Sequence, residues 1–250
     1  MSGHSKWHSI KHKKMATDAK KGKIFTKLIR EIMMAAKTGG GNPDTNPRLR
    51  MVIEKAKSLN MPNDNIQRAI KKGLGEEGGV QLEQVTYEGY APGGVAVFVE
   101  VLTDNKNRSA SEIRAIFSRH NGNLGGAGSV AWLFERKGVI TVKKEGVKED
   151  ELLEIILDAG AEDMKAEDDT YEIITSPEKF DNVKKTLSEK NIPMDEATIT
   201  FVPKNTVRVE GKTAEQVLKL LEALEDHDDV QGAYANFDIP DEIVNAVSSE

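Results

Sequence analysis

The chain has 250 residues, of which 38% are hydrophobic and 30% are charged, and it contains no cysteine. This composition is typical of a soluble globular protein, and it excludes a disulfide scaffold, a thiol nucleophile and a zinc–thiolate site. No apolar run reaches the roughly 18 residues of a membrane span, and the polar start predicts no secretory signal, so we expect a cytoplasmic location.

The net charge of −6 conceals a strong segregation of charge along the chain. Residues 1–75 carry 13 Lys and 4 Arg against 5 acidic residues, a net charge of +12, and the remaining residues carry −18. If the charged side chains only solvated the surface, the two signs would be mixed along the chain. The pattern favours an N-terminal part that binds a polyanion and a remainder that resists such binding.

The first residues combine many lysines with one tryptophan, Trp7, and a single acid, Asp18. Too few side chains are apolar to pack a core, so residues 1–23 are predicted to form a mobile basic arm. Lysines that recur every seven residues would form one stripe on a helix, which suits phosphate contacts, and Trp7 could stack on a base. A solvated tail is the alternative.

The three histidines of this arm, His4, His8 and His12, recur every four residues, as metal ligands on a helix do. The lysines among them would repel a divalent cation, and a carboxylate partner is lacking nearby. We therefore predict no metal site here.

Residues 24–79 are predicted to fold as a small basic helical domain, because apolar side chains recur there at helical spacing. Three helices are expected, joined by loops that contain Gly or Pro. Asn46 and Pro47 are expected to cap and open the second helix, and Asn63 or Asp64 to cap the third.

Residues 80–136 are predicted to form a strand, a strand, a helix and a strand, which is an incomplete unit. Ser109 and Glu112 fit the capping-box pattern at the start of the helix. The second strand is almost continuously apolar, which indicates burial on both faces. The strands are expected at residues 84–92, 94–104 and 129–135.

Residues 137–205 follow the order β-α-β-β-α-β, which is the ferredoxin-like pattern. The chain then returns with a strand, a helix over residues 214–225 and an alternating strand, which we expect to complete the middle domain. The predicted fold class is therefore α+β and multidomain. An N-terminal three-helix domain precedes two α/β domains, of which the ferredoxin-like one is inserted into the other, and the predicted boundaries of the latter are 80–136 plus 206–240. Residues 241–250 would form a C-terminal tail.

Two stretches echo nucleotide-binding motifs without meeting their requirements. Residues 211–213 resemble the end of a P-loop, but Thr206 stands at the position of its first glycine, and Thr213 with Gln216 fits a capping box. The glycine-rich stretch 121–129 leads into a predicted strand rather than a helix, so the dinucleotide fingerprint fails. A flexible loop and a loop that contacts a ligand or RNA both stay open.

The sequence assembles no catalytic set. The acidic stretches 167–169 and 225–229 lack the spacing of a Ca²⁺ loop and are predicted to be solvated. His120 and His227 are the candidate bases outside the arm, and neither has an evident nucleophile partner. We predict a protein without enzymatic activity, metal or cofactor, and a hydrolase is the third hypothesis behind the two given below.

Five long motifs resemble the YebC family: MSGHSKWHSIKHKK, GGGNPDTNPRLR, MPNDNIQRAIKKG, YEGYAPGGVAVFVEVLTDNKNR and LGGAGSVAWLF. The resemblance covers essentially the whole chain. It implies a helical domain followed by two α/β domains, one interrupting the other, and no enzymatic activity or cofactor. Bacterial relatives are described as DNA-binding transcriptional regulators. Others resemble ribosome-associated factors that help translation through consecutive prolines, and mitochondrial members act as translational activators.

The sequence thus predicts a non-enzymatic factor that binds nucleic acid and regulates gene expression. A DNA-binding transcriptional regulator is the first hypothesis, and a translation factor on ribosomal RNA and the ribosome is the alternative. No membrane or small-molecule partner is expected. The residues expected to contact nucleic acid are Lys6, Trp7, His8, Lys11, His12, Lys13, Lys14, Lys20, Lys21, Lys23, Lys27, Arg30, Arg48, Arg50, Arg68, Lys71, Lys72, Lys106 and Arg108.

Overall fold

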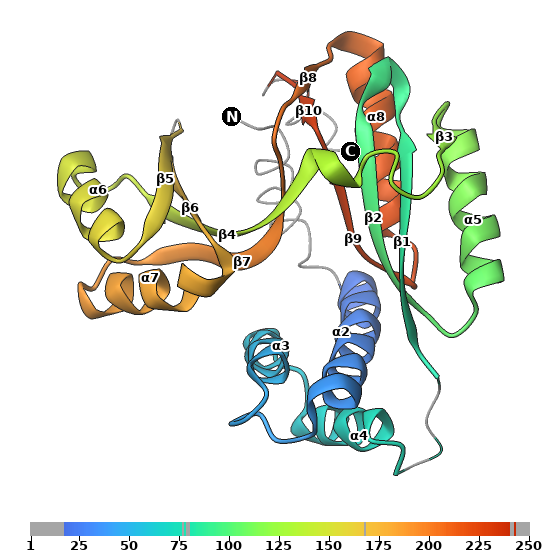
Figure 1. Ribbon diagram of the computed structural model, residues 1–250, viewed down its shortest axis with the longest axis horizontal. Coiled ribbons are helices and arrows are strands. Elements are labelled where there is room, and N and C mark those ends of the chain that lie inside the picture. The colour runs from blue at the N-terminus through green and yellow to red at the C-terminus, as the bar shows by residue number, and fades with distance from the viewer. Residues whose placement is uncertain (1–17, 77, 79–80, 168, 241–242, 244–250) are drawn as a thin grey trace. The chain divides into compact units, whose positions relative to one another are not determined.

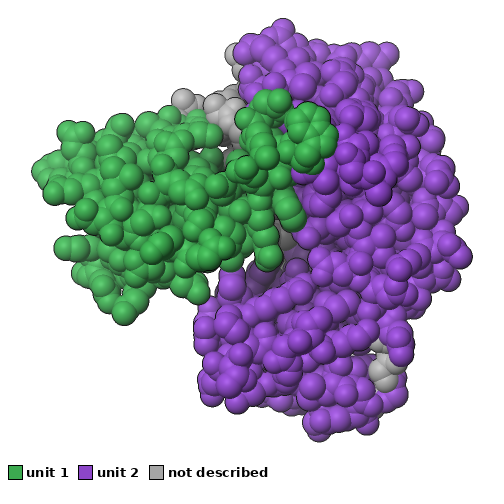
Figure 2. All heavy atoms as spheres, viewed as in Figure 1, with its two compact units in different colours: residues 1, 132–205 green, residues 2–131, 206–250 purple. Residues whose placement is uncertain are grey.

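The computed structural model describes residues 18–76, 78, 81–167, 169–240 and 243 (Figure 1). They divide into two compact units (Figure 2). Unit 1 comprises residues 132–205, and unit 2 comprises the described residues before and after it. Both units are α+β, and each contains a four-stranded antiparallel sheet. None of the described helices is both long and apolar enough to cross a membrane.

Unit 2 begins with three amphipathic helices that share one core, as their apolar spacing predicts. Their buried side chains include Ile32, Leu49 and Ile66, one from each helix. The first helix starts at Asp18 rather than at Ile24, so the last residues of the predicted mobile arm are helical. The helices are α2 (Asp18–Gly39), α3 (Pro47–Ser58) and α4 (Asn63–Gly73).

Helix starts in this region are only partly as predicted. Asn46 caps α3, and Pro47 is its first residue, as expected. The predicted cap of α4 by Asn63 or Asp64 is wrong, because both residues already lie in its first turn and Pro62 occupies the cap position without a side-chain hydrogen bond. The extended backbone of Pro62 ends the preceding segment, so the helix can start directly after it.

Asn46 joins the end of α2 to the start of α3. Its side chain is buried, with 5% of the residue exposed. The Nδ2 amide donates to the carbonyl oxygens of Ala35 (2.9 Å) and Gly40 (2.8 Å), and Oδ1 accepts from the backbone N–H of Leu49 (3.1 Å). Both N–H groups and the oxygen of one amide thus hold the end of α2 against the start of α3.

We expect Asn46→Ala to lower the local free energy of unfolding of α2 and α3 by about 2–3 kcal/mol, since it removes a cap and two buried donors. Native-state hydrogen exchange of the helix amides measures this value. Asn46→Asp keeps the cap acceptor but cannot donate to both carbonyl groups, so it should be no more stable than the alanine variant. Recovery of most of the loss by Asp would show that only the cap matters.

The rest of unit 2 is an antiparallel sheet in the order β3-β1-β2-β9, with α5 and α8 packed on it. The strand β2 is buried along nearly its whole length, as its continuous apolar pattern predicts. A short parallel pair, β8-β10, extends the unit. The elements are β1 (Glu83–Tyr90), η1 (Pro92–Gly94), β2 (Ala96–Thr103), α5 (Lys106–Arg119), β3 (Asn123–Leu124), β8 (Val207–Arg208), α8 (Gly211–Glu225), β9 (Val230–Ala235) and β10 (Phe237–Asp238).

Both predicted capping boxes in this unit are wrong. Helix α5 starts at Lys106, and its cap is Asn105, whose side chain accepts from the backbone N–H of Arg108 at 3.1 Å. Ser109 therefore lies inside the helix, where it is buried. Helix α8 starts at Gly211, two residues before Thr213, and no side chain caps it.

In its described residues, unit 1 has two α-helices and four strands, in the sheet order β5-β6-β4-β7 with every neighbouring pair antiparallel. Its core lies between the sheet and the helices and contains Ile140, Ile156, Ile173 and Phe180. The elements are β4 (Phe134–Lys143), α6 (Glu149–Asp158), β5 (Ala161–Ala166), β6 (Thr170–Thr175), α7 (Pro177–Glu189) and β7 (Met194–Pro203).

The strand predicted over residues 129–135 does not form as such. Residues 131–133 make a 3-10 turn, η2 (Ala131–Leu133), and the strand β4 then runs without interruption to Lys143. The two-residue strand β3, and not residues 129–135, pairs with β1. Apolar residues in a 3-10 turn and in a strand give the same local pattern, which explains the difference.

Candidate nucleic-acid interface

The predicted contact residues fall into three groups in the structure. Those from Lys6 to Lys14 lie outside the described residues, and Lys20 and Lys21 belong to α2. A second group projects from α3 and α4 and is exposed. A third group, on α2 and at the start of α5, contacts acidic groups or carbonyl oxygens of the chain itself.

The exposed group is the strongest candidate for an interface. In the described part of the chain none of its side chains makes an ion pair, so their charge faces solvent. Two members, Lys55 and Lys57 on α3, were not predicted, although their position in a helix rich in lysine and arginine could have indicated them. Guanidinium and ammonium groups of this kind bind phosphate oxygens. The group, called here the α3/α4 cations, comprises Arg48, Arg50, Lys55, Lys57, Arg68, Lys71 and Lys72.

Three cations of α2 contact the end of α8 and the residues that follow it. Lys23 Nζ donates to the carbonyl oxygen of Asp226 (3.3 Å), and Lys27 Nζ donates to that of Glu225. Arg30 donates to the carbonyl oxygen of Asp228 at 2.9 Å. Positive charge is favourable there, because the last carbonyl groups of a helix carry the negative end of its dipole. These three predicted contact residues thus attach α2 to the sheet part of unit 2.

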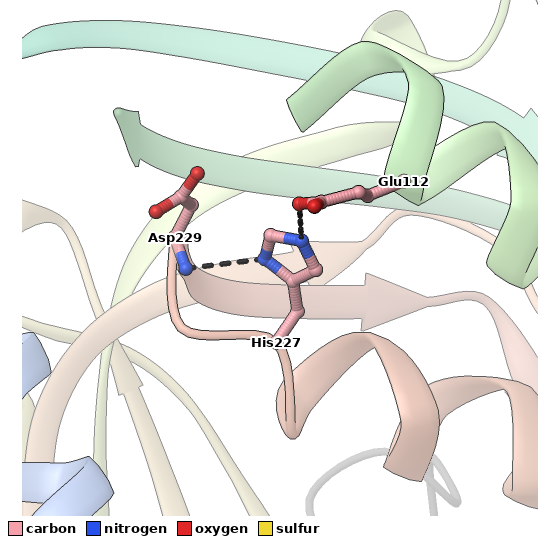
Figure 3. A group of neighbouring side chains, drawn as sticks. All are labelled: Glu112, His227 and Asp229. Carbon is pink, nitrogen blue, oxygen red and sulfur yellow. Dashed lines mark hydrogen bonds and ion pairs between the residues drawn. The ribbon is translucent and has the colours of Figure 1, made fainter. Parts of the chain in front are cut away.

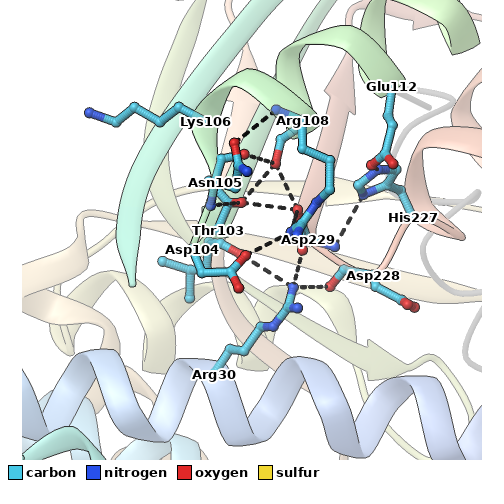
Figure 4. Close-up of polar contacts among 12 residues, drawn as sticks. Arg30, Thr103, Asp104, Asn105, Lys106, Arg108, Glu112, His227, Asp228 and Asp229 are labelled. Atoms are coloured by element: carbon cyan, nitrogen blue, oxygen red, sulfur yellow. Dashed lines mark hydrogen bonds and ion pairs between the residues drawn. The ribbon is translucent and has the colours of Figure 1, made fainter. Parts of the chain in front are cut away.

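Asp229 is the centre of a buried polar network (Figure 4). It is only 2% exposed. Oδ1 pairs with Arg30, and Oδ2 accepts from Arg108 Nη2 (2.9 Å), Ser109 Oγ (2.7 Å) and Thr103 Oγ1 (3.0 Å). The stretch 225–229, predicted to be solvated, is therefore buried at this residue, because two arginines and two hydroxyl groups satisfy its charge.

These contacts decide the ionisation of the carboxyl group. Burial by itself raises the pKa of Asp229, but hydrogen bonds from Ser109, Arg108 and Arg30 outweigh burial and lower the pKa well below its usual range. The Asp229 hydrogen bond, followed by that of Asp104, raises the pKa of Arg108. Asp229 and Arg108 are thus both ionised at neutral pH.

Lys106 and Arg108, the two residues at the start of α5 that are expected to contact nucleic acid, pair with carboxylates of the chain itself. Arg108 pairs with Asp104 (2.8 Å) as well as with Asp229. Lys106 pairs with Glu83 on β1. Both predicted contact residues therefore have acidic partners within unit 2.

Three side chains of the types that bind metal ions lie close together in the described residues: Glu112, His227 and Asp229 (Figure 3). Their potential ligand atoms all lie within 4.8 Å of one another. His227 Nδ1 accepts from the backbone N–H of Asp229 (3.1 Å), which places the proton of the neutral ring on Nε2, 2.8 Å from Glu112 Oε2. The carboxylate of Asp229 is already bound by two guanidinium groups, which would repel a cation. The geometry therefore fits an ion-paired network better than a metal centre.

Of the two histidines considered as bases, His120 lies at the end of α5 and is half-buried. Burial, and then the charges of Arg119 and Lys219, lower the pKa of His120. The ring is therefore neutral near pH 7, and His227 contacts an acid and a backbone N–H rather than a nucleophile.

The glycine-rich loop is organised by Glu88, which the sequence did not reveal as a functional or structural residue. Glu88 is 5% exposed, and its carboxylate accepts from the backbone N–H groups of Gly128, Val130 and Ala131, each at 2.7 Å. Burial raises the pKa of Glu88, but the three N–H groups outweigh burial and lower it. The anion that these amides bind is thus a side chain of β1.

Two family models match the chain. The TACO1/YebC N-terminal domain matches residues 5–76, and the second and third domains of TACO1/YebC match residues 82–237. The matches together cover the helical part, the sheet part of unit 2 and the whole of unit 1.

Full-length relatives are similar over nearly every residue. A protein of Dictyoglomus turgidum named "Probable transcriptional regulatory protein" is 62% identical over 249 residues, which are 99% of this chain and 100% of that one. A protein of Thermotoga maritima with the same name is 57% identical over 250 residues, which are 100% of this chain and 98% of that one.

A solved structure has the same fold. The crystal structure of a conserved hypothetical protein from Aquifex aeolicus superposes with a TM-score of 0.80 at 54% identity, over 90% of this chain and 93% of that chain. With family models and full-length relatives in agreement, the chain belongs to the TACO1/YebC family.

Proposed function

We propose that the chain is a nucleic-acid-binding regulatory factor, and that the α3/α4 cations together with the basic N-terminal segment form its binding surface. The observation that carries this proposal is the contrast within one basic domain. Lys23, Lys27 and Arg30 of α2 contact acidic and carbonyl groups of the chain itself, whereas the seven cations of α3 and α4 face solvent. Exposed cations on two neighbouring helices fit a phosphate backbone.

A DNA-binding transcriptional regulator in the cytoplasm is the specific form of the proposal. Two similar proteins carry the name "Probable transcriptional regulatory protein". The exposed surface of α3 and α4 also offers side chains that can read base edges, Arg48, Arg50, Gln67 and Arg68. No catalytic role is included, because the cluster around Asp229 and His227 is held by ion pairs and hydrogen bonds to neighbouring side chains of the chain itself.

A translation factor on ribosomal RNA is the second candidate. It is favoured by the excess of lysine over arginine in residues 1–75, 13 against 4, since lysine contacts phosphates without reading sequence. Crosslinking in cells followed by sequencing separates the two candidates. Peaks at promoters would support the first, and reads concentrated in ribosomal RNA would support the second and rule out the first.

We also propose that unit 1 is a ferredoxin-like domain inserted into an α/β domain built from residues on both sides of it. Its strand order, β5-β6-β4-β7, supports the first part. The pairing of β9, after unit 1, with β2, before it, supports the second.

The binding surface is tested by neutralising charge in matched triples. Arg68→Gln, Lys71→Gln and Lys72→Gln on α4 are expected to weaken binding to duplex DNA or to ribosomal RNA at least about tenfold. The slope of log affinity against log salt should fall by about 2–3, since each phosphate contact contributes about 0.9 on duplex DNA. The control triple removes exposed lysines of unit 1, Lys165→Gln, Lys179→Gln and Lys190→Gln. Equal losses from both triples would contradict a surface on α3 and α4.

A further inference from the structure

Helix α6 of unit 1 carries an apolar ridge on its outer face. Leu153 and Leu157, one turn apart, are 36% and 49% exposed, whereas Leu152 and Ile156 are fully buried in the core. A single exposed leucine is ordinary, but two that are four residues apart form one continuous apolar strip. The helix therefore has apolar side chains on more than the face that its own unit covers.

Carboxylates border this ridge along one side and at its N-terminal end. In the described residues they make no ion pair, whereas Glu151, further round the helix, pairs with Lys148 at 2.6 Å. The ridge and its border form one surface, called here the α6 face. The bordering residues are Glu149, Asp150, Glu154 and Asp158.

The position of two of these acids is unfavourable for the helix itself. Acids in the first turn interact well with the positive end of the helix dipole, which accounts for Glu149 and Asp150. Glu154 and Asp158 lie in the second half, where the dipole is negative, and no basic residue lies in the last turn. One face of α6 thus carries two exposed leucines together with negative charge that no cation of the described residues compensates. Neither feature stabilises unit 1.

We propose that the α6 face docks a lysine- and arginine-rich amphipathic segment of a partner protein. Such a segment would cover the leucines with its apolar side and pair its cations with the carboxylates. Nucleic acid and anionic membranes would be repelled by the same carboxylates. A second copy of this chain, packed by two-fold symmetry, would bring equal charges together. This inference goes beyond the proposed function and does not depend on which nucleic acid is bound.

The helix is held firmly enough to present a fixed surface. Asn182 Nδ2 on α7 donates to the carbonyl oxygen of Ala159 (2.8 Å), at the end of α6. Leu152 and Ile156 anchor its inner face in the core of unit 1. A partner therefore meets a preformed ridge, which lowers the entropy cost of binding.

The test uses the full chain with methyl-labelled leucine and a synthetic amphipathic peptide made only of lysine and leucine. We expect the peptide to shift the methyl NMR signals of Leu153 and Leu157 and to bind more weakly as salt rises. The double variant Leu153→Ser/Leu157→Ser should bind at least about tenfold more weakly. Glu154→Gln/Asp158→Asn should weaken binding and reduce its dependence on salt.

The matched control is Glu178→Gln/Asp181→Asn, which removes two exposed carboxylates from α7 and should leave the affinity within about twofold. Retained α6 amide signals in each variant show that the helix is intact. Equal binding by the double serine variant, or equal binding of a lysine-only peptide, would overturn the proposal. So would a dimer that the serine variant dissociates in sedimentation, because the face would then bind a second copy. None of these three outcomes affects the test of the α4 cations.

Discussion

Replacing Asp229 by alanine is expected to lower the free energy of unfolding of unit 2 by about 3–5 kcal/mol, the range found when one partner of a buried ion pair is removed. The variant leaves Arg30 without its carboxylate partner and deprives the hydroxyl groups of Ser109 and Thr103 of their acceptor. Because Arg30 belongs to α2 and Arg108 to α5, the loss should loosen the attachment of the helical part to the sheet part within unit 2.

The chain offers a close control in the neighbouring residue. The carboxylate of Asp228 is exposed, and Arg30 contacts only its backbone carbonyl oxygen. Asp228→Ala should therefore change the free energy of unfolding by less than about 0.5 kcal/mol. Urea denaturation followed by circular dichroism measures both values. Similar losses from the two variants would show that the network contributes nothing specific.

Acid should remove the stabilisation that the Asp229 carboxylate provides to the folded chain. The pKa of Asp229 is lowered in the folded chain, so its stabilisation is fully present above the usual aspartate pKa of about 3.9 and is lost as the pH falls below it. The difference in Tm between the wild type and Asp229→Asn is thus expected to be large at pH 7 and to shrink on acidification below about pH 4. A constant difference would mean that the charge of Asp229 does not matter.

The Asp229 network also shows where prediction from the sequence ends. Helical spacing located α2, α3 and α4, and the β-α-β-β-α-β pattern gave the elements of unit 1, because both signals are local. The partners of Asp229, Arg30 and Arg108, are 199 and 121 residues away along the chain. A stretch of acids such as 225–229 looks solvated until the fold brings cations to it.

For the candidate binding surface, too, the sequence predicted what depends on local composition but not what depends on contacts between distant residues. The excess of positive charge in the first domain was evident from composition, and five of the seven α3/α4 cations were predicted from it. Composition could not show that Lys23, Lys27 and Arg30 contact carbonyl groups of the chain itself, because those partners lie 198–203 residues away along the chain. Likewise, Ser109 matched a capping box, but the side chain of Asn105 caps the helix one turn earlier and the hydroxyl of Ser109 bonds to Asp229.

The second large effect is expected at Glu88. Glu88→Ala leaves three backbone N–H groups around a buried site without an acceptor, each of which costs about 1 kcal/mol or more. We expect a loss of about 3 kcal/mol in the free energy of unfolding, together with faster hydrogen exchange at Gly128, Val130 and Ala131. On the same strand, Glu83 is exposed and pairs with Lys106, so Glu83→Ala should cost less than about 1 kcal/mol.

Glu88→Gln separates the two oxygens of the carboxylate. Oε1 accepts from Gly128, and Oε2 accepts from both Val130 and Ala131. A glutamine side chain can keep two of the three hydrogen bonds if its oxygen accepts from Val130 and Ala131. Its NH₂ group then lies against the N–H of Gly128, and two donors face each other there. Exchange should therefore accelerate at Gly128 and stay slow at Val130 and Ala131. Because the pKa of Glu88 is lowered in the folded chain, acid below about pH 4 should loosen the wild-type loop in the same way. Uniform exchange at all three amides in the glutamine variant would contradict the assignment of the two oxygens.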